Sequence, residues 1–134
     1  MRLYTDLKAS IELTDNDLTT THNGFTGGHD VFSVYLKRED GDDHNYNQVK
    51  ITLNIDDLNF NAIQGWSGKV YLGSDELSEE EWDELDDFVS IEEIADSNIR
   101  QIQFRIYVPA GQESEYYTDK VSISVTATKV EPNT

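Results

Sequence analysis

The chain alternates between apolar and polar residues in four stretches, and this pattern predicts its strongest β-strands. These stretches are Val31–Lys37, Gln48–Ile55, Gln101–Val108 and Lys120–Thr128. Every second side chain in them is apolar, so one face of each strand can be buried while the other stays polar. Antiparallel sheets that pack on one side have this pattern. We expect the core to contain the apolar residues of these strands: Phe32, Val34, Val49, Ile51, Leu53, Phe104, Ile106, Val121, Ile123 and Val125.

Three further stretches give weaker strand predictions, at Arg2–Lys8, Ser10–Thr14 and Trp66–Leu72. Turn-favouring pairs such as Asn23-Gly24 and Gly73-Ser74 separate the predicted strands. About seven short strands joined by such turns favour two sheets packed face to face. The predicted fold class is therefore all-β, a two-sheet antiparallel sandwich.

One segment between the strands has the features of a helix start. Ser78 can cap a helix, and Glu81 three residues later completes a capping box. Apolar residues follow on one helical face, at i, i+3 and i+7: Trp82, Leu85 and Val89. We expect one short helix insertion that covers an open end of the sandwich, and we interpret Ser90–Ile94 as a short further turn.

No repeat or linker divides the 134 residues, so the sequence predicts a single domain over residues 1–134. Residues 1–26 are interpreted as additional N-terminal strands or an arm. Residues 131–134 are expected to form a frayed tail, as chain ends commonly do.

Charge changes the expectation about partners. The chain has 10 Lys and Arg residues against 27 Asp and Glu residues, which gives a formal net charge of -17. Such a chain repels phosphate groups, so we expect neither nucleic acid nor membrane as a partner. Two interpretations of the acidity stay open. The acids can serve solubility, or they can adapt the protein to high salt, where counterions screen the repulsion among them.

No residue pattern predicts catalysis, and we expect neither an enzyme nor a cofactor. The chain has no cysteine, and its three histidines, His22, His29 and His44, lie in predicted loops without metal-ligand spacing. A glycoside hydrolase needs two facing carboxylates. Among 27 acids, the sequence singles out no such pair.

One acidic loop offers oxygens to a cation. Asp40, Asp42 and Asp43 are weak candidates for metal ligands, and we expect no dedicated metal site. The EF-hand pattern fails because Ile51 occupies the position that requires a bidentate Glu. The alternative is a solvated loop tip.

The polar faces of the strands hold candidate contact residues. Ser122, Ser124 and Thr126 give the last predicted strand a face with few charges, where a neighbouring subunit can dock without burying unpaired carboxylates. Arg105 and Tyr107 share the polar face of another strand. Arg105 is a candidate ion-pair anchor between chains, although a salt bridge within the chain is the favoured alternative. The tyrosines at outward positions suit contacts with another protein, or they are ordinary surface residues of the strands.

Four segments, taken in order, are similar to parts of a known family. They are Gly27–Arg38, Tyr46–Ile51, Leu77–Trp82 and Phe104–Gly111. The first two resemble consecutive strands of that family, the third resembles its acidic helix start, and the fourth resembles a strand that ends in Val-Pro-Ala-Gly. Together they resemble the small immunoglobulin-like β-sandwich modules in structural proteins of tailed phages and tailed archaeal viruses. The resemblance runs from Gly27 to about Lys129 and does not include the first 26 residues.

This resemblance implies an immunoglobulin-like sandwich without catalytic residues. The implied protein is a virion component on the capsid surface or in the tail or its fibres. It would contact other virion proteins, as a homo-oligomer or within a larger assembly. Its expected location is the virion, after synthesis in the host cytoplasm, because Met1–Asp6 does not begin a signal peptide. Together with the acidic composition, the resemblance suggests a virus of a halophilic host.

The alternative is a sandwich module that binds carbohydrate or a cell surface. Such modules stack sugar rings on exposed aromatic side chains. We therefore expect Trp66 and Tyr46 to lie exposed together on one rim if this alternative holds.

The net charge predicts that salt stabilises the fold. Because monovalent salt screens repulsion among the carboxylates, the midpoint of thermal unfolding should rise from low to molar sodium chloride. Scanning fluorimetry across a salt series measures this midpoint. A midpoint that stays flat or falls over the series contradicts adaptation to high salt.

Overall fold

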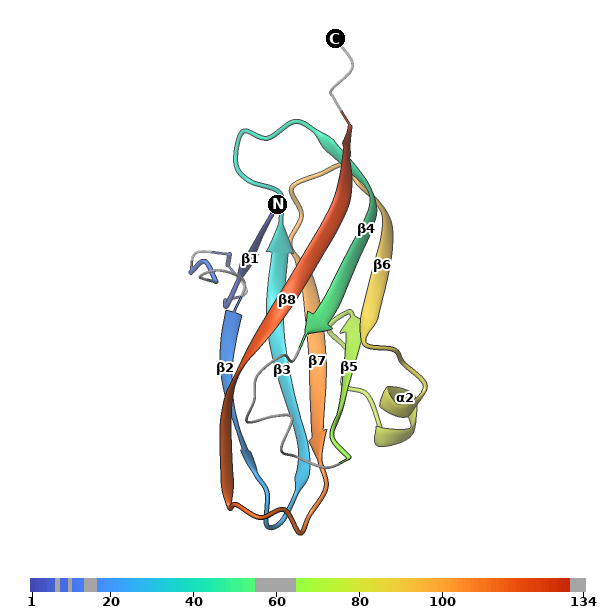
Figure 1. Ribbon diagram of the computed structural model, residues 1–134. Helices are drawn as coiled ribbons and strands as arrows, with labels where there is room; N and C mark the ends of the chain where they lie inside the picture. Colours follow the sequence, from blue (N-terminus) through green and yellow to red (C-terminus); the bar gives the residue numbers. More distant parts are fainter. Residues whose placement is uncertain (7, 10, 14–16, 55–64, 131–134) are drawn as a thin grey trace.

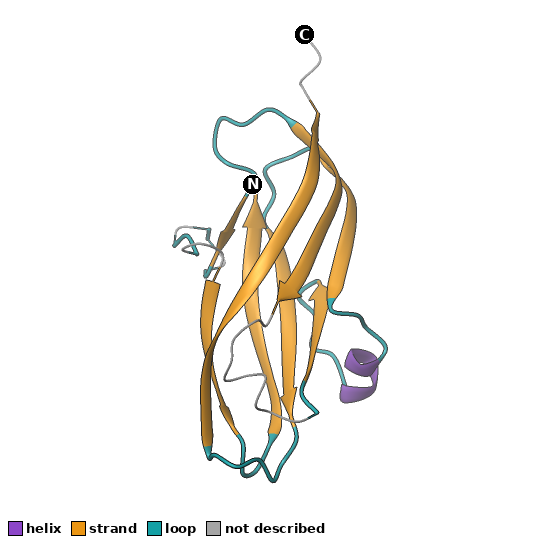
Figure 2. Ribbon diagram, viewed as in Figure 1, coloured by secondary structure: helices purple, strands orange, loops and turns teal. Residues whose placement is uncertain are grey.

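The computed structural model describes residues 1–6, 8–9, 11–13, 17–54 and 65–130, and these form strands and one short helix. The elements are β1 (Arg2–Tyr4), β2 (Asp17–Asn23), β3 (Gly28–Lys37), β4 (Asn45–Asn54), β5 (Ser67–Leu72), α2 (Glu79–Asp83), β6 (Phe88–Ile94), β7 (Arg100–Val108) and β8 (Tyr116–Val130). The strands form two antiparallel sheets, with the order β1-β3-β7-β5 in sheet A and β2-β8-β4-β6 in sheet B (Figures 1 and 2). The predicted all-β, two-sheet sandwich with one short helix is confirmed.

Consecutive strands always lie in opposite sheets. The odd-numbered strands build sheet A and the even-numbered strands build sheet B, so no strand pairs with the next one along the chain. This order differs from that of constant-type immunoglobulin domains, in which the first two strands are neighbours in one sheet. Every pairing therefore joins segments that are distant in sequence, which costs more loop-closure entropy than a hairpin does.

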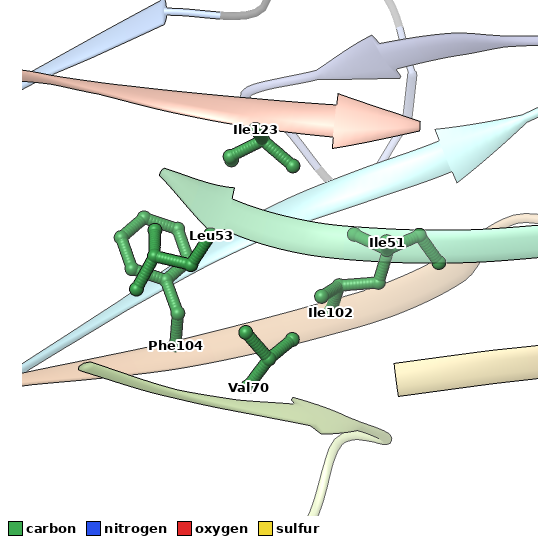
Figure 3. A pocket seen from close by; sticks show the side chains of 6 residues that line it. All are labelled: Ile51, Leu53, Val70, Ile102, Phe104 and Ile123. Carbon is green, nitrogen blue, oxygen red and sulfur yellow. The ribbon is translucent and has the colours of Figure 1, made fainter. Parts of the chain in front are cut away.

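The core lies between the two sheets. Figure 3 shows side chains from both sheets that point toward one another and enclose no space large enough for a water molecule: Ile51, Leu53, Val70, Ile102, Phe104 and Ile123. Eight of the ten predicted core residues are buried. The other two, Phe32 and Val125, are half-buried and pack against the core. The strand registers read from alternation are therefore correct for the central strands.

A β-bulge in β4 changes which of its residues face the core. The pairing of β4 with β8 shifts by one residue between Asn47 and Lys50, and Gln48 has a positive φ of 53°. Such a bulge inserts one extra residue into a strand and re-aims its neighbours. Tyr46 and Val49 are both buried although they are three residues apart, so strict alternation predicts the wrong side for Tyr46.

Two strands are absent from the sequence prediction. β2 contains a single strongly apolar residue, Leu18, and its three threonines give the only strand preference. His22, expected in a loop, lies in β2 and is buried. The interpretation of Ser90–Ile94 as a helical turn is wrong, because these residues belong to β6, which pairs with β4.

The N-terminal predictions are too long. The strand predicted over Arg2–Lys8 ends at Tyr4. Within the predicted strand Ser10–Thr14, Glu12 forms only an isolated bridge with Tyr4. Residues 7, 10, 14–16 and 55 and the predicted tail at 131–134 lie outside the described residues.

The helix starts as predicted but ends early and lies elsewhere. The capping box of Ser78 and Glu81 is present, and the helix stops at Asp83. The helix lies beside β5 (Figure 1), and Trp82 packs against the outer face of sheet A, beside Tyr71 and Arg105. The expectation that the helix covers an open end is therefore wrong. Within the described ranges, no helix has the length and apolar character needed to cross a membrane.

We expect Trp82→Ala to lower the free energy of unfolding by about 3–5 kcal/mol, because a buried Trp loses most of its packing. Trp82 is only 3% exposed. Urea unfolding followed by circular dichroism measures the change. Phe25→Ala, at a side chain that is 53% exposed, is the matched control and should change stability by less than about 0.5 kcal/mol. An equally small effect of Trp82→Ala would show that the helix does not stabilise the sandwich.

Candidate interaction surface

The outer face of sheet A is covered in part by the chain's own β5–β6 connection. Gln103, on β7, donates hydrogen bonds from Nε2 to the carbonyl oxygens of Gly73 at 2.8 Å and Asp75 at 2.9 Å. Lys69, on β5, donates from Nζ to the carbonyl of Leu85 at 2.7 Å. These polar side chains therefore fasten the connection across the sheet.

Arg105 lies beneath this connection and is 2% exposed. Its Nη2 donates to Oδ1 of Asp83 at 2.8 Å, and its guanidinium carbon lies 5.7 Å from the centre of the Trp82 ring. The hydrogen bond from Arg105 lowers the pKa of Asp83. Arg105 thus forms the intrachain salt bridge that the sequence favoured, and it is not accessible as an anchor for another chain.

Tyr107 is half-buried on the same face and also has an intrachain partner. Its ring stacks on that of His29, with the ring centres 4.6 Å apart. The structure therefore separates the predicted contact residues into two groups. Arg105 and Tyr107 lie on sheet A, whereas Ser122, Ser124 and Thr126 lie on sheet B, on the opposite side of the molecule.

The outer face of sheet B contains the polar residues predicted on the last strand. Ser122 and Ser124 are half-buried and Thr126 is exposed. Asn54, on β4, donates a hydrogen bond from Nδ2 to the Ser124 hydroxyl at 2.5 Å. Strand pairing adds residues from two more strands, and we call the whole set the sheet B face: Ser122, Ser124, Thr126, Thr128, Lys50, Thr52, Asn54, Phe88 and Ser90.

None of these nine residues carries a carboxylate, but acids border the set within sheet B: Asp17 of β2 pairs with Ser122, and Glu93 of β6 pairs with Asn47, the partner of Thr128. Its register forms cross-strand rows, one of which joins Thr126, Lys50 and Ser90. Lys50 Nζ lies 4.5 Å from the centre of the Phe88 ring, a cation–π contact. Along β6, Ser90 is followed by Ile91 and then by the acids Glu92 and Glu93. In a chain of 27 acids, this face is therefore neutral except for one lysine.

Sequence reasoning missed the contributions of Lys50, Phe88 and Ser90. Alternation marks Lys50 and Thr52 as outward, but it does not say which strands lie beside them. Phe88 and Ser90 belong to the strand that was interpreted as part of a helix. A helix-stop signal after Asp83 could have revealed them, but the sequence has no Gly or Pro there.

The aromatic pair required by a glycan platform does not form. Tyr46 is buried, and its hydroxyl donates to Oδ2 of Asp42 at 2.5 Å. Tyr46 pairs with Lys129 at the end of the sandwich where β3 connects to β4. Trp66 precedes β5, whose first residue pairs with Tyr107 at the other end. Trp66 and Tyr46 therefore lie at opposite ends of the molecule.

The acidic loop between β3 and β4 is braced by its own hydrogen bonds. Asp42 Oδ1 accepts from the backbone nitrogen of His44 at 2.9 Å and from its Nδ1 at 2.8 Å. Asp42, Asp43 and His44 bring possible ligand atoms within 4.8 Å of one another. Asp40 is not part of this group and instead pairs with Lys37 at 2.8 Å. A cation at Asp42 would have to displace hydrogen bonds that hold the loop.

The end of the sandwich opposite this loop is an aromatic tip. The β2–β3 turn and the β7–β8 connection are joined there, since the nitrogen of Gln112 donates to the carbonyl of Gly24 at 2.9 Å. Phe25 and Tyr116 are 53% and 64% exposed at this tip. These two side chains form a second possible contact surface.

A third feature is an acidic hollow beside α2. It has a volume of about 420 Å³, and its lining includes Asp75, Glu76, Glu81 and Glu84. Glu81 is the capping-box acid, and Asp75 accepts a hydrogen bond from the Tyr71 hydroxyl at 3.2 Å. Two of the four carboxylates therefore have a structural role.

Comparison with known proteins adds no relative from which a site could be transferred. No protein-family model, curated protein or solved structure matches this chain. The resemblance to tailed-virus modules therefore remains a prediction from the sequence. A proposal about function has to be argued from the surfaces described above.

The pair of Tyr46 and Asp42 predicts a pH-dependent contribution to stability. The hydrogen bond from Tyr46 holds the pKa of Asp42 well below its usual range, and the same bond raises the pKa of Tyr46 to about 12. A lowered carboxyl pKa stabilises the fold above about pH 4, and this contribution is lost as the pH falls further. A raised phenol pKa stabilises it below about pH 10, and this contribution is lost as the pH rises toward 12.

We therefore expect Tyr46→Phe to lower the free energy of unfolding by about 1.5–3 kcal/mol at pH 7, the range for a hydrogen bond to a charged group. The difference from the wild-type protein should shrink below about pH 4 and above about pH 10. Urea unfolding at several pH values measures it. Tyr116→Phe, at an exposed tyrosine, is the control and should behave like wild type at every pH. If Tyr46→Phe lowers the free energy of unfolding by the same amount at every pH, the hydrogen bond from Tyr46 to the Asp42 carboxylate is not the cause.

Proposed function

We propose that this protein is a non-enzymatic structural component of a tailed-virus particle, on the capsid surface or in the tail or its fibres. It acts through subunit contacts that the sheet B face makes with other virion proteins. The host of this virus is a halophile, which accounts for the net charge of -17. The single observation that carries the proposal is the absence of carboxylates from the sheet B face.

The physical argument concerns the cost of burying charge. A carboxylate that enters an interface without a partner loses its hydration, which is expensive. Docking through the sheet B face buries hydroxyls and amides, the half-exposed ring of Phe88 and one lysine. The hydroxyls and amides can exchange hydrogen bonds with water for hydrogen bonds with a partner.

The contrast between the two sheets supports the same assignment. The connection that carries Trp82 already lies over part of sheet A and is fastened by Gln103, Lys69 and Arg105. Sheet B has no such cover among the described residues. The broad strand surface that the described residues leave uncovered is therefore the one that contains the carboxylate-free set on β8, β4 and β6.

A second candidate function is a module that binds a cell surface or carbohydrate. The exposed rings of Phe25 and Tyr116 at the aromatic tip favour it, since exposed aromatic side chains provide contact area for partners and for sugars. The tip lies away from the sheet B face, so substitutions can separate the two functions.

We expect Ser90→Glu to reduce the number of copies of this chain in purified virus particles at least tenfold. The substitution places a carboxylate on the sheet B face at an exposed position of β6, where the fold should tolerate it. Mass spectrometry of particles produced with each variant measures the copy number, and thermal unfolding of the isolated chain checks the fold. Ser74→Glu, at an exposed position of the β5–β6 connection, is the control and should be incorporated normally.

Two results would contradict the proposal: absence of the wild-type chain from particles, or normal incorporation of Ser90→Glu. Loss of attachment to cells or glycans in Tyr116→Glu, together with normal incorporation of Ser90→Glu, would favour the surface-binding alternative.

A further inference from the structure

One half of β8 has a free edge within the described part of the chain. From Tyr116 to Ser122, β8 pairs with β2, and from Ser122 to Val130 it pairs with β4 on its other side. β2 begins at Asp17, opposite Ser122. Beyond that point, no described strand continues along the edge that β2 occupies, and Figure 1 shows β8 rising past the start of β2. We call residues 123–130 of β8 the free edge.

A groove lies beside the free edge. Its volume is about 250 Å³, and it is lined by Met1 and Leu3 near the start of the chain, Tyr46 on β4, and Val125 and Ala127 on β8. These residues come from both sheets, so the groove opens between sheet A and sheet B. A strand added to the free edge would project every second side chain over this groove.

Among the described residues, the free edge lacks the features that normally block strand addition. Natural edges are protected by charged side chains, proline, bulges or a covering segment. Residues 123–130 contain no proline and no acid, and Lys129 is the one charged residue. Ile123, Val125 and Val130 also favour an extended strand. No described residue therefore blocks pairing of this edge with another strand.

We infer that a second copy of this chain occupies the free edge, with its β8 antiparallel to the first and a two-fold axis close to Thr126. Paired residues of an antiparallel sheet point to the same face. Such an axis places Val125 of one copy opposite Ala127 of the other, both on the groove side. Each copy then covers the groove of the other with apolar side chains. A two-fold contact needs this kind of self-complementary surface.

Charge also favours a second copy at this place. Two chains with a net charge of -17 repel each other, and contact is least unfavourable where neither presents a carboxylate. Residues 123–130 contain no carboxylate, so the paired segments of both copies meet this condition along their whole length. The pairing would join sheet B of both copies into one sheet with a continuous sheet B face. This inference rests on the proposed function and deepens it, because the dimer would be the unit that contacts other virion proteins through the sheet B face.

Sedimentation of the purified full-length chain across a concentration and salt series tests the inference. We expect a monomer–dimer equilibrium that shifts toward the dimer as sodium chloride screens the repulsion. Ala127→Lys should weaken dimerisation at least tenfold, because it places an ammonium group in the groove, opposite Val125 of the other copy. Ser90→Lys, on the sheet B face away from the free edge, is the matched control and should dimerise like wild type.

Disulfide cross-linking tests the position of the axis. The chain has no cysteine, so a single substitution gives an unambiguous product. We expect Thr126→Cys to form a covalent dimer under mild oxidation, because the axis brings the two positions directly opposite each other. Ser33→Cys, on the outer face of sheet A, is the control and should form no covalent dimer under the same conditions.

The inference is overturned if the chain stays monomeric at every concentration and salt level, or if Ala127→Lys dimerises normally. It is also overturned if Thr126→Cys cross-links to a different virion protein but not to itself, which would leave the proposed function intact. A dimer with these properties in a protein that is absent from particles would support the inference and contradict the proposed function.

Discussion

The structure depends on the apolar layer that the two sheets share. Each of the alternating central strands has one apolar face, and that face is buried only when the opposite sheet is in place. Because consecutive strands alternate between sheets A and B, no neighbouring pair of strands can form a stable hairpin first. The dry contact of Ile51 and Leu53 with Phe104 and Ile102 therefore holds together segments from the whole length of the chain (Figure 3).

The sandwich leaves two outer faces, and the chain treats them differently. On sheet A, polar side chains form hydrogen bonds with the β5–β6 connection. Arg105 is buried beneath Trp82 and forms an ion pair with Asp83. On sheet B, hydroxyl and amide side chains from β4, β6 and β8 stay uncovered among the described residues. Association through sheet B, as proposed above, would leave most carboxylates hydrated while a neutral face contacts the partner.

The sheet B face and the free edge of β8 are continuous, because both belong to the same half of β8. Pairing along the edge would enlarge the face without adding acids to it. High salt weakens the remaining repulsion between copies and so favours association. The acidic composition, the neutral sheet B face and the free edge of β8 therefore all bear on one property, which is how copies of this chain would associate.

The sequence by itself determined which residues are buried along the central strands, because alternation is a local property of extended chains. It also identified the Ser122, Ser124 and Thr126 face and the capping box at Ser78. Tertiary structure alone decided which strands lie side by side, since every pairing here is non-local. Lys50 and Phe88 meet only through the pairing of β4 with β6, and the bulge at Gln48 turns Tyr46 into the core. Arg105 becomes buried because Asp83, 22 residues earlier in the chain, is carried over it by a connection whose path no local pattern records.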